Sequence, residues 1–249
     1  GVQTCALPIF NGQGRRMRQE ADYFWFGTGV HFALEDFHGV NYYGHPAIAF
    51  RAYAMATLAN GKIPPNWREL EIVGMGVMSY YAEMYLRNRD PLQTYVVDGV
   101  PQCEVNARID LGVQDASGRQ LLYGFTLDRV AIDEYERLWI VEYKTAKVFR
   151  TEHYETDDQI TAYCWAAWKY YGKPVAGVVY QQHKKTLPML PKVLSTGKIS
   201  HDKRQQTTAA RAPVREQPVL CIARRCNTHQ QANTFVVRRA GNALKLVVG

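Results

Sequence analysis

The segment LWIVEYKTAK, residues 138–147, constrains the fold more than any other part of this chain. Its first half is apolar on both faces of a strand, because Leu138 and Ile140 alternate with Trp139 and Val141. Strands of this kind are covered on both sides and lie in the middle of a sheet. The segment therefore predicts a central strand with other elements packed against both of its faces.

Two ionisable side chains, Glu142 and Lys144, share one face of this strand. An unpaired charge is costly in a covered position, so these two residues need a partner. One explanation is an ion pair between them, or a strand end that already reaches solvent. Asp128 offers a second explanation, because it lies in the preceding strand, 14 positions before Glu142. In a short antiparallel hairpin the two carboxylates would converge at one end of the sheet.

Converging carboxylates repel one another unless a cation lies between them. Hard oxygen ligands of this kind suit Mg²⁺ or Mn²⁺, which retain water molecules for chemistry. An amine beside the cation can orient or deprotonate the attacking water, or stabilise charge that develops on a phosphate. The pattern of Asp128, Glu142 and Lys144 thus outlines a site for phosphodiester hydrolysis.

The remaining pattern predicts an α/β fold with a mixed central sheet flanked by helices. Three strands with short connections can form an antiparallel meander, and a crossover helix can then place a fourth strand parallel to its neighbour. The expected elements are helices from about Thr28 to Gly39, over 47–61 and over 66–90, strands over 103–113, 120–133 and 137–147, a helix over 156–171 and a strand over 174–185.

These motifs resemble the PD-(D/E)XK nuclease superfamily, through Asp128 in GFTLDRVAID and the EYKT segment that begins at Glu142. The proline that usually precedes the aspartate is a leucine here. The chain looks most like the RecB-type branch, which includes phage exonucleases and CRISPR-associated relatives. That branch adds a histidine on an early helix, matched by His31, and a Q-xxx-Y motif, matched by Gln159 and Tyr163.

The resemblance implies a restriction-endonuclease-like core and metal-dependent cleavage of DNA that leaves a 5′-phosphate and a 3′-hydroxyl. It implies three roles for residues of this chain. The catalytic residues are Asp128, Glu142 and Lys144; the ligands of Mg²⁺ or Mn²⁺ are His31, Asp128, Glu142 and the backbone carbonyl of Tyr143; the DNA-binding residues are Gln159, Tyr163, Lys184, Lys185, Lys203 and Arg204.

Several of these residues have alternative interpretations. His31 could be a buried structural histidine, or it could form a separate zinc site with Glu35 and His38, which share its helical face. That zinc site would leave the two strand carboxylates unexplained. Gln159 could be the partner of Thr156 in a capping box at the start of its helix.

Two further acidic residues lie near the motifs. Glu104, at the start of the first strand, is expected to be solvated rather than catalytic. Asp133 is the rival to Asp128, but it falls on the opposite strand face, which makes it a poor partner for the same ion.

The net charge of +7 comes mostly from the C-terminal segment, because residues 209–249 contain seven basic residues and one acidic residue. The overall charge therefore does not argue for nucleic acid by itself. A local basic run from Lys184 to Arg204 is a candidate phosphate-binding stretch, with a solvated loop as the alternative.

The two ends of the chain are expected to lie outside the nuclease domain, which we place at residues 10–208. The opening GVQTCALPIF resembles the translation of a common sequencing adaptor, so we exclude residues 1–9. Residues 209–249 are expected to be a frameshifted or chimaeric tail, with a genuine irregular extension as the alternative, because residues 209–233 show no sustained helical or strand period.

The five cysteines show no CxxC pair, which argues against a disulfide framework and favours a cytoplasmic protein, in the bacterial host if phage-encoded. We expect no iron–sulfur cluster within residues 10–208 and no membrane segment. The expected function is that of a DNA exonuclease in phage or bacterial recombination or repair, with phage or host recombination proteins as candidate partners. Two alternatives remain: a DNA-binding module that does not cut, and a structure-specific or restriction-type endonuclease.

Overall fold

The structure is a computed structural model that describes residues 22–88, 90–147, 158–188, 193–198, 219–225, 234–240 and 243–248. Within these ranges, side chains are described except at 87–88, 158–159 and 219–248. Three helices come first and pack on one another: α1 (Asp22–His38), α2 (Pro46–Ala59) and α3 (Trp67–Asn88). They precede a mixed sheet and a fourth helix, α4 (Asp158–Tyr171).

Helix α1 begins at Asp22, six residues before the expected start at Thr28. The added turn contains Trp25 and Phe26, which are both fully buried. Their burial stabilises a helical segment that Gly27 and Gly29 make unfavourable by local propensity alone.

The sheet contains the expected meander and crossover. Strands β4, β5 and β6 pair antiparallel, and β6 pairs parallel with β7 after α4. Gly172 ends α4 with a φ of 66°, and its N–H donates to the carbonyl of Trp168. The strands are β1 (Gln93–Thr94), β2 (Val96–Val97), β3 (Val100–Pro101), β4 (Cys103–Gln114), β5 (Gln120–Ile132), β6 (Leu138–Ala146), β7 (Val175–Lys184), β8 (Val219–Arg225), β9 (Thr234–Ala240) and β10 (Ala243–Val248).

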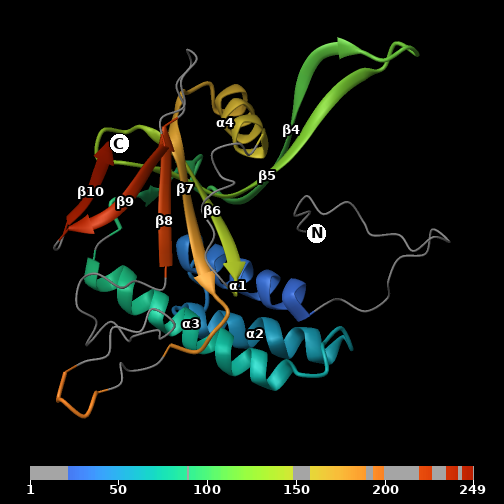
Figure 1. The fold of residues 1–249 in the computed structure, drawn as a ribbon. Helices are drawn as coiled ribbons and strands as arrows, with labels where there is room; N and C mark the ends of the chain where they lie inside the picture. The colour runs from blue at the N-terminus through green and yellow to red at the C-terminus, as the bar shows by residue number, and fades with distance from the viewer. Residues whose placement is uncertain are drawn as a thin grey trace.

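Strand β6 has a separate hydrophobic core on each of its faces, as its sequence predicts. Trp139 and Val141 pack with the residues of α1, α2 and α3. Leu138 and Ile140 pack with α4 on the other face. Figure 1 shows the first three helices below the sheet and α4 above it. Strand β6 therefore lies between the two hydrophobic cores of the molecule.

The β4–β5 hairpin continues past the body of the protein as a two-stranded arm (Figure 1). Val105, Ala107, Ile109 and Leu111 alternate as a half-buried strand would, but only Ile109 is buried, and Leu111 is 40% exposed. The distal part of the alternating face has no body to pack against, which is why the expected burial stops at Ile109.

The C-terminal segment contains strands that its sequence pattern did not predict. β8 pairs with β7, and β9 and β10 extend the sheet further. β8 lies within residues 209–233, where we expected no regular element. Sheet edges accept short strands through backbone hydrogen bonds alone, so a weak side-chain period does not prevent pairing. Residues 1–9 lie outside the described ranges.

Cys103 is free, whereas Cys164 is disulfide-bonded, so the argument against disulfides from the cysteine spacing does not hold for Cys164. Among the helices that the structure describes, none has both the length and the apolar character needed to cross a bilayer.

Candidate active site

Asp128 lies where strands β5 and β6 separate. The paired residues end at Arg129 and Val141, and the same register would place Asp128 opposite Glu142. Beyond this point the Asp128 side chain replaces a backbone acceptor, because its Oδ2 accepts the backbone N–H of Tyr143 at 2.6 Å. The strand pairing thus places Asp128 and Glu142 near the same end of the hairpin, and the charge of Asp128 raises the pKa of Glu142. Among the described residues, the group with metal-ligand spacing contains Asp128 but not Glu142.

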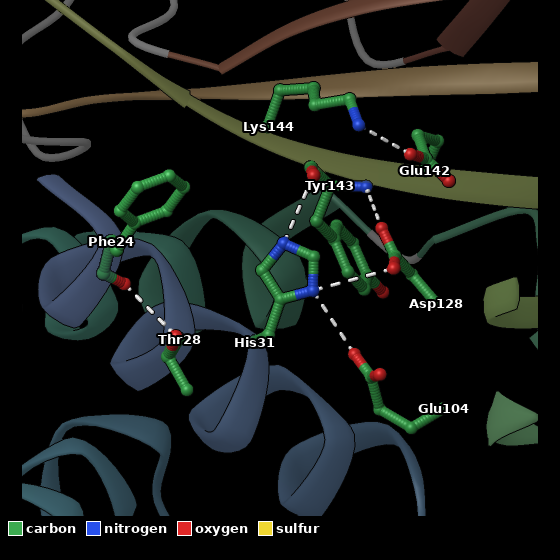
Figure 2. Close-up of polar contacts among 8 residues, drawn as sticks. All are labelled: Phe24, Thr28, His31, Glu104, Asp128, Glu142, Tyr143 and Lys144. Carbon is green, nitrogen blue, oxygen red and sulfur yellow. Dashed lines mark hydrogen bonds and ion pairs between the residues drawn. The ribbon is translucent and has the colours of Figure 1, made fainter. Parts of the chain in front are cut away.

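His31 joins this group from α1 (Figure 2). Its Nδ1 lies 3.3 Å from Oδ1 of Asp128 and 3.0 Å from Oε1 of Glu104, and its Nε2 lies 3.1 Å from the carbonyl oxygen of Tyr143. Burial alone would lower the pKa of His31, but the two carboxylates outweigh it and raise that pKa to about 10. The imidazole therefore lies in a strongly negative environment.

Glu142 and Lys144 form an ion pair beside this group, with Nζ of Lys144 donating to Oε1 of Glu142 at 2.6 Å. Burial and the nearby charge of Asp128 raise the pKa of Glu142 to about 7, against the opposing effect of Lys144. Oε2 of Glu142 is buried and has no hydrogen-bond partner in the structure. The simple ion pair considered from the sequence exists, but it satisfies only one of the two carboxylate oxygens.

Glu104 belongs to the site, and the expectation that it would be solvated is wrong. Its side chain is only 16% exposed and contacts His31. The pairs Cys103–Arg129 and Val105–Leu127 on either side place it opposite Asp128. Oxygen and nitrogen atoms of His31, Glu104 and Asp128 lie within 4.8 Å of one another, a spacing compatible with a shared metal ion.

A buried imidazole, three acidic side chains and a lysine thus converge at one end of a mixed sheet. A family model described as the PD-(D/E)XK nuclease superfamily matches residues 2–233 of the chain. The chain belongs to this superfamily. No curated protein matches it. As a PD-(D/E)XK nuclease, it has the predicted fold class, and its family implies metal-dependent cleavage with DNA as substrate.

The donor set of this nuclease suits a divalent cation. Carboxylate oxygens, a main-chain carbonyl and one imidazole are ligands that Mg²⁺ and Mn²⁺ accept. The buried, unpartnered Oε2 of Glu142 and the raised pKa of that residue are both signs of negative charge that a cation would offset. The residues present therefore fit the metal that the superfamily uses.

The alternative zinc site is not supported, because His38 makes other contacts. Its Nε2 lies 2.6 Å from the hydroxyl of Tyr81, and its ring stacks on Tyr143. Burial lowers the pKa of His38 well below its ordinary value. Among the described residues, the group with metal-ligand spacing contains neither Glu35 nor His38. His38 is thus a structural residue of the helical core.

The rival acid Asp133 has a structural role at the other end of the hairpin. It accepts hydrogen bonds from the side chains of Arg137 at 2.7 Å and Trp139 at 3.0 Å. It also accepts the backbone N–H groups of Tyr135 and Arg137 in the β5–β6 turn. These contacts explain why the sequence contains an aspartate here without assigning it to catalysis.

The predicted DNA-binding residues fall into two groups. Tyr163 on α4 is partly buried and close enough to Lys144 to influence its pKa. Lys184 pairs with Ala146 at the end of β6, and the N–H of Lys185 donates to the Ala146 carbonyl, so both lysines lie just beyond the active-site strand. Gln159 lies in the first turn of α4, but its side chain is outside the described residues, as are Lys203 and Arg204.

Proposed function

We propose that this PD-(D/E)XK protein is an exonuclease of the RecB-type branch that cleaves DNA with Mg²⁺ or Mn²⁺ during phage or bacterial recombination or repair. The observation that carries the proposal is the position of His31. The residue contacts both Asp128 and the carbonyl of Tyr143. A bare Asp…Glu-x-Lys pattern does not require a histidine at this point, whereas the RecB-type resemblance does.

His31, Asp128, Glu142 and the carbonyl of Tyr143 would hold the cation. When bound, the cation would supply an activated water molecule and offset the negative charge of the scissile phosphate. The protein's own contribution is the rigid placement of these ligands on two strands and one helix, with the main-chain N–H of Tyr143 holding Asp128 in position.

Lys144 acts as a positively charged donor in this arrangement. Its Nζ already donates to Glu142, and the Lys144 side chain is 32% exposed, so it can also reach a phosphate oxygen that enters from solvent. A fixed ammonium at that position stabilises the additional negative charge of the transition state. This role requires that the lysine keeps its proton throughout the reaction.

Tyr163 and Gln159 would line the path of the DNA on the α4 side, next to Lys144. Lys184 and Lys185 would contact phosphates beyond the end of β6. Both lysines lie near the ends of the parallel neighbours β6 and β7, further along the strands than the carboxylates. A DNA backbone that runs across this end of the sheet would therefore contact both. Lys203 and Arg204 would add further phosphate contacts.

The proposal can be tested with two DNA substrates, a linear duplex labelled at its ends and a covalently closed circle of the same sequence. We expect the purified protein to degrade the linear DNA in Mg²⁺ or Mn²⁺, to leave the circle intact, and to lose activity in EDTA. Cleavage of the circle would favour the endonuclease alternative. DNA binding without cleavage in either metal would favour the binding module.

Matched variants connect the activity to the site. Glu142→Gln should abolish cleavage, whereas Glu134→Gln should not, because Glu134 is an exposed glutamate on the β5–β6 turn at the far end of the same strand. Full activity in purified Glu142→Gln would contradict the assignment.

A further inference from the structure

Glu104 has a backbone conformation that glutamate rarely adopts. Its φ is 46°, in the left-handed region, which is disfavoured for residues other than glycine. The strand β4 could continue more easily with an extended residue at this position. Such an outlier persists where the surrounding structure requires it, and it often marks a functional contact.

The contact that this conformation supports is the one to His31. Oε1 of Glu104 lies 3.0 Å from Nδ1, closer than Oδ1 of Asp128 at 3.3 Å. Asp128 already has its other oxygen engaged by the N–H of Tyr143. Glu104 is therefore the carboxylate whose main polar contact in the structure is to the imidazole.

The two ring nitrogens of His31 face different groups. Nδ1 faces the carboxylates, and Nε2 faces the carbonyl of Tyr143, which is itself a proposed metal ligand. Figure 2 shows Glu104 and the Tyr143 carbonyl on opposite sides of the ring. In metal sites, a histidine commonly donates its second N–H to a carboxylate, which orients the ring and directs the other nitrogen to the ion.

We propose that Glu104 is a positioning residue that accepts a hydrogen bond from Nδ1 of His31 and so directs Nε2 toward the metal. This inference rests on the proposed metal site but assigns Glu104 a role outside the ligand set. The competing arrangement is direct ligation, since Glu104 is also within ligand spacing of His31 and Asp128. In the proposed arrangement Glu104 affects metal binding only through His31, whereas in the competing one it binds the metal itself.

A double-mutant cycle on metal affinity separates them. Mn²⁺ binding is measured by titration calorimetry without DNA, in the full chain and in Glu104→Gln, His31→Gln and the double variant. If Glu104 acts through His31, Glu104→Gln should weaken binding by about tenfold or more in the presence of His31. In the His31→Gln background the same change should have almost no effect.

An equal loss of affinity in both backgrounds would show that Glu104 ligates the ion directly and would overturn the inference. No loss in either background would overturn it too. If wild-type protein bound no metal, the proposed function itself would fail, so the two failures are distinguishable. Glu104→Asn provides a second variant should Glu104→Gln not fold, because asparagine tolerates the left-handed backbone.

Nuclear magnetic resonance of the ¹⁵N-labelled imidazole gives an independent measurement in the Mg²⁺-bound protein. The inference requires the proton of His31 to reside on Nδ1 and Nε2 to be unprotonated. A proton on Nε2 with Nδ1 unprotonated would exclude the proposed orientation, even if the cycle could not be completed.

Discussion

Oδ2 of Asp128 accepts the backbone N–H of Tyr143 at 2.6 Å, at the point where the β5–β6 ladder ends. The side chain replaces a backbone acceptor, so separation of the strands does not leave the amide unsatisfied. Its other oxygen faces His31. The same residue thus closes the sheet end and orients a carboxylate toward the proposed metal position.

The two aspartates of β5 and its turn should separate function from stability. Asp128→Asn retains an acceptor for the Tyr143 amide but loses a charged ligand, so we expect loss of cleavage with modest change in stability. Asp133→Asn should keep cleavage and lower the free energy of unfolding by about 1–3 kcal/mol, because it weakens charge-assisted bonds to Arg137. Urea unfolding and a cleavage assay on both variants provide the comparison, and the reverse pattern would contradict the site.

Lys144→Ala should separate metal binding from the chemical step. We expect single-turnover cleavage to fall by roughly 100-fold or more, as for loss of one transition-state donor. Mn²⁺ affinity should stay the same or increase, because an ammonium that competes for Glu142 has been removed. Calorimetry and quenched-flow measurements on the same preparation test both parts. A variant that loses metal affinity and activity together would instead indicate a structural role.

DNA affinity should fall as the pH rises through about 8, because of Lys185. Burial, together with the charge of Lys147, lowers the pKa of Lys185 to about 8. The ammonium is therefore charged below that pH and becomes neutral above it, so its phosphate contact weakens from pH 7 to pH 9. We expect an effect of about threefold for one contact.

Fluorescence anisotropy of labelled DNA with the Glu142→Gln protein measures this affinity without cleavage. Lys185→Arg should flatten the pH dependence, because arginine stays charged across this range. The same slope in Lys185→Arg would show that another group is responsible.

Packing between α2 and α3 should make Gly74 intolerant of alanine. A Cβ at this position would lie 2.2 Å from ring atoms of Phe50, which is fully buried. We expect Gly74→Ala to lower the free energy of unfolding by about 1–3 kcal/mol despite the higher helix propensity of alanine. Gly27→Ala on α1 is the matched control, since its Cβ would meet only Thr145 Oγ1 at 3.4 Å. Similar effects at both positions would argue against the close approach.

The sequence determined the part of the site that depends on regular hairpin geometry. The β5–β6 turn follows a simple register, so the spacing of Asp128 and Glu142 was sufficient to predict that they converge. The two-sided apolar pattern of β6 likewise predicted a central strand with a core on each face. Both features can be predicted from side-chain alternation and a short hairpin, because neither prediction requires the elements that pack on β6 to be known.

The position of Glu104 in the site was decided by the tertiary structure. Gln114 pairs with Gln120 next to the β4–β5 turn. If this register continued without interruption, Asn106 would lie opposite Asp128. An irregularity between Asp110 and Gln114, which contains Gly112 at a φ of 70°, adds two residues to β4 and brings Glu104 there instead. A bulge of this kind shifts every pairing that follows it, and its position has no signal in side-chain periodicity.

The start of the helix that contains His31 was also decided by the tertiary structure. Its motif indicated that the histidine lies on an early helix, but local propensity placed the start of that helix too late. Burial of Trp25 and Phe26 against other elements extends the helix, and only packing between segments distant in sequence supplies that energy. The chemical identity of the site was thus encoded locally, whereas the register and packing that orient its groups arose from contacts across the fold.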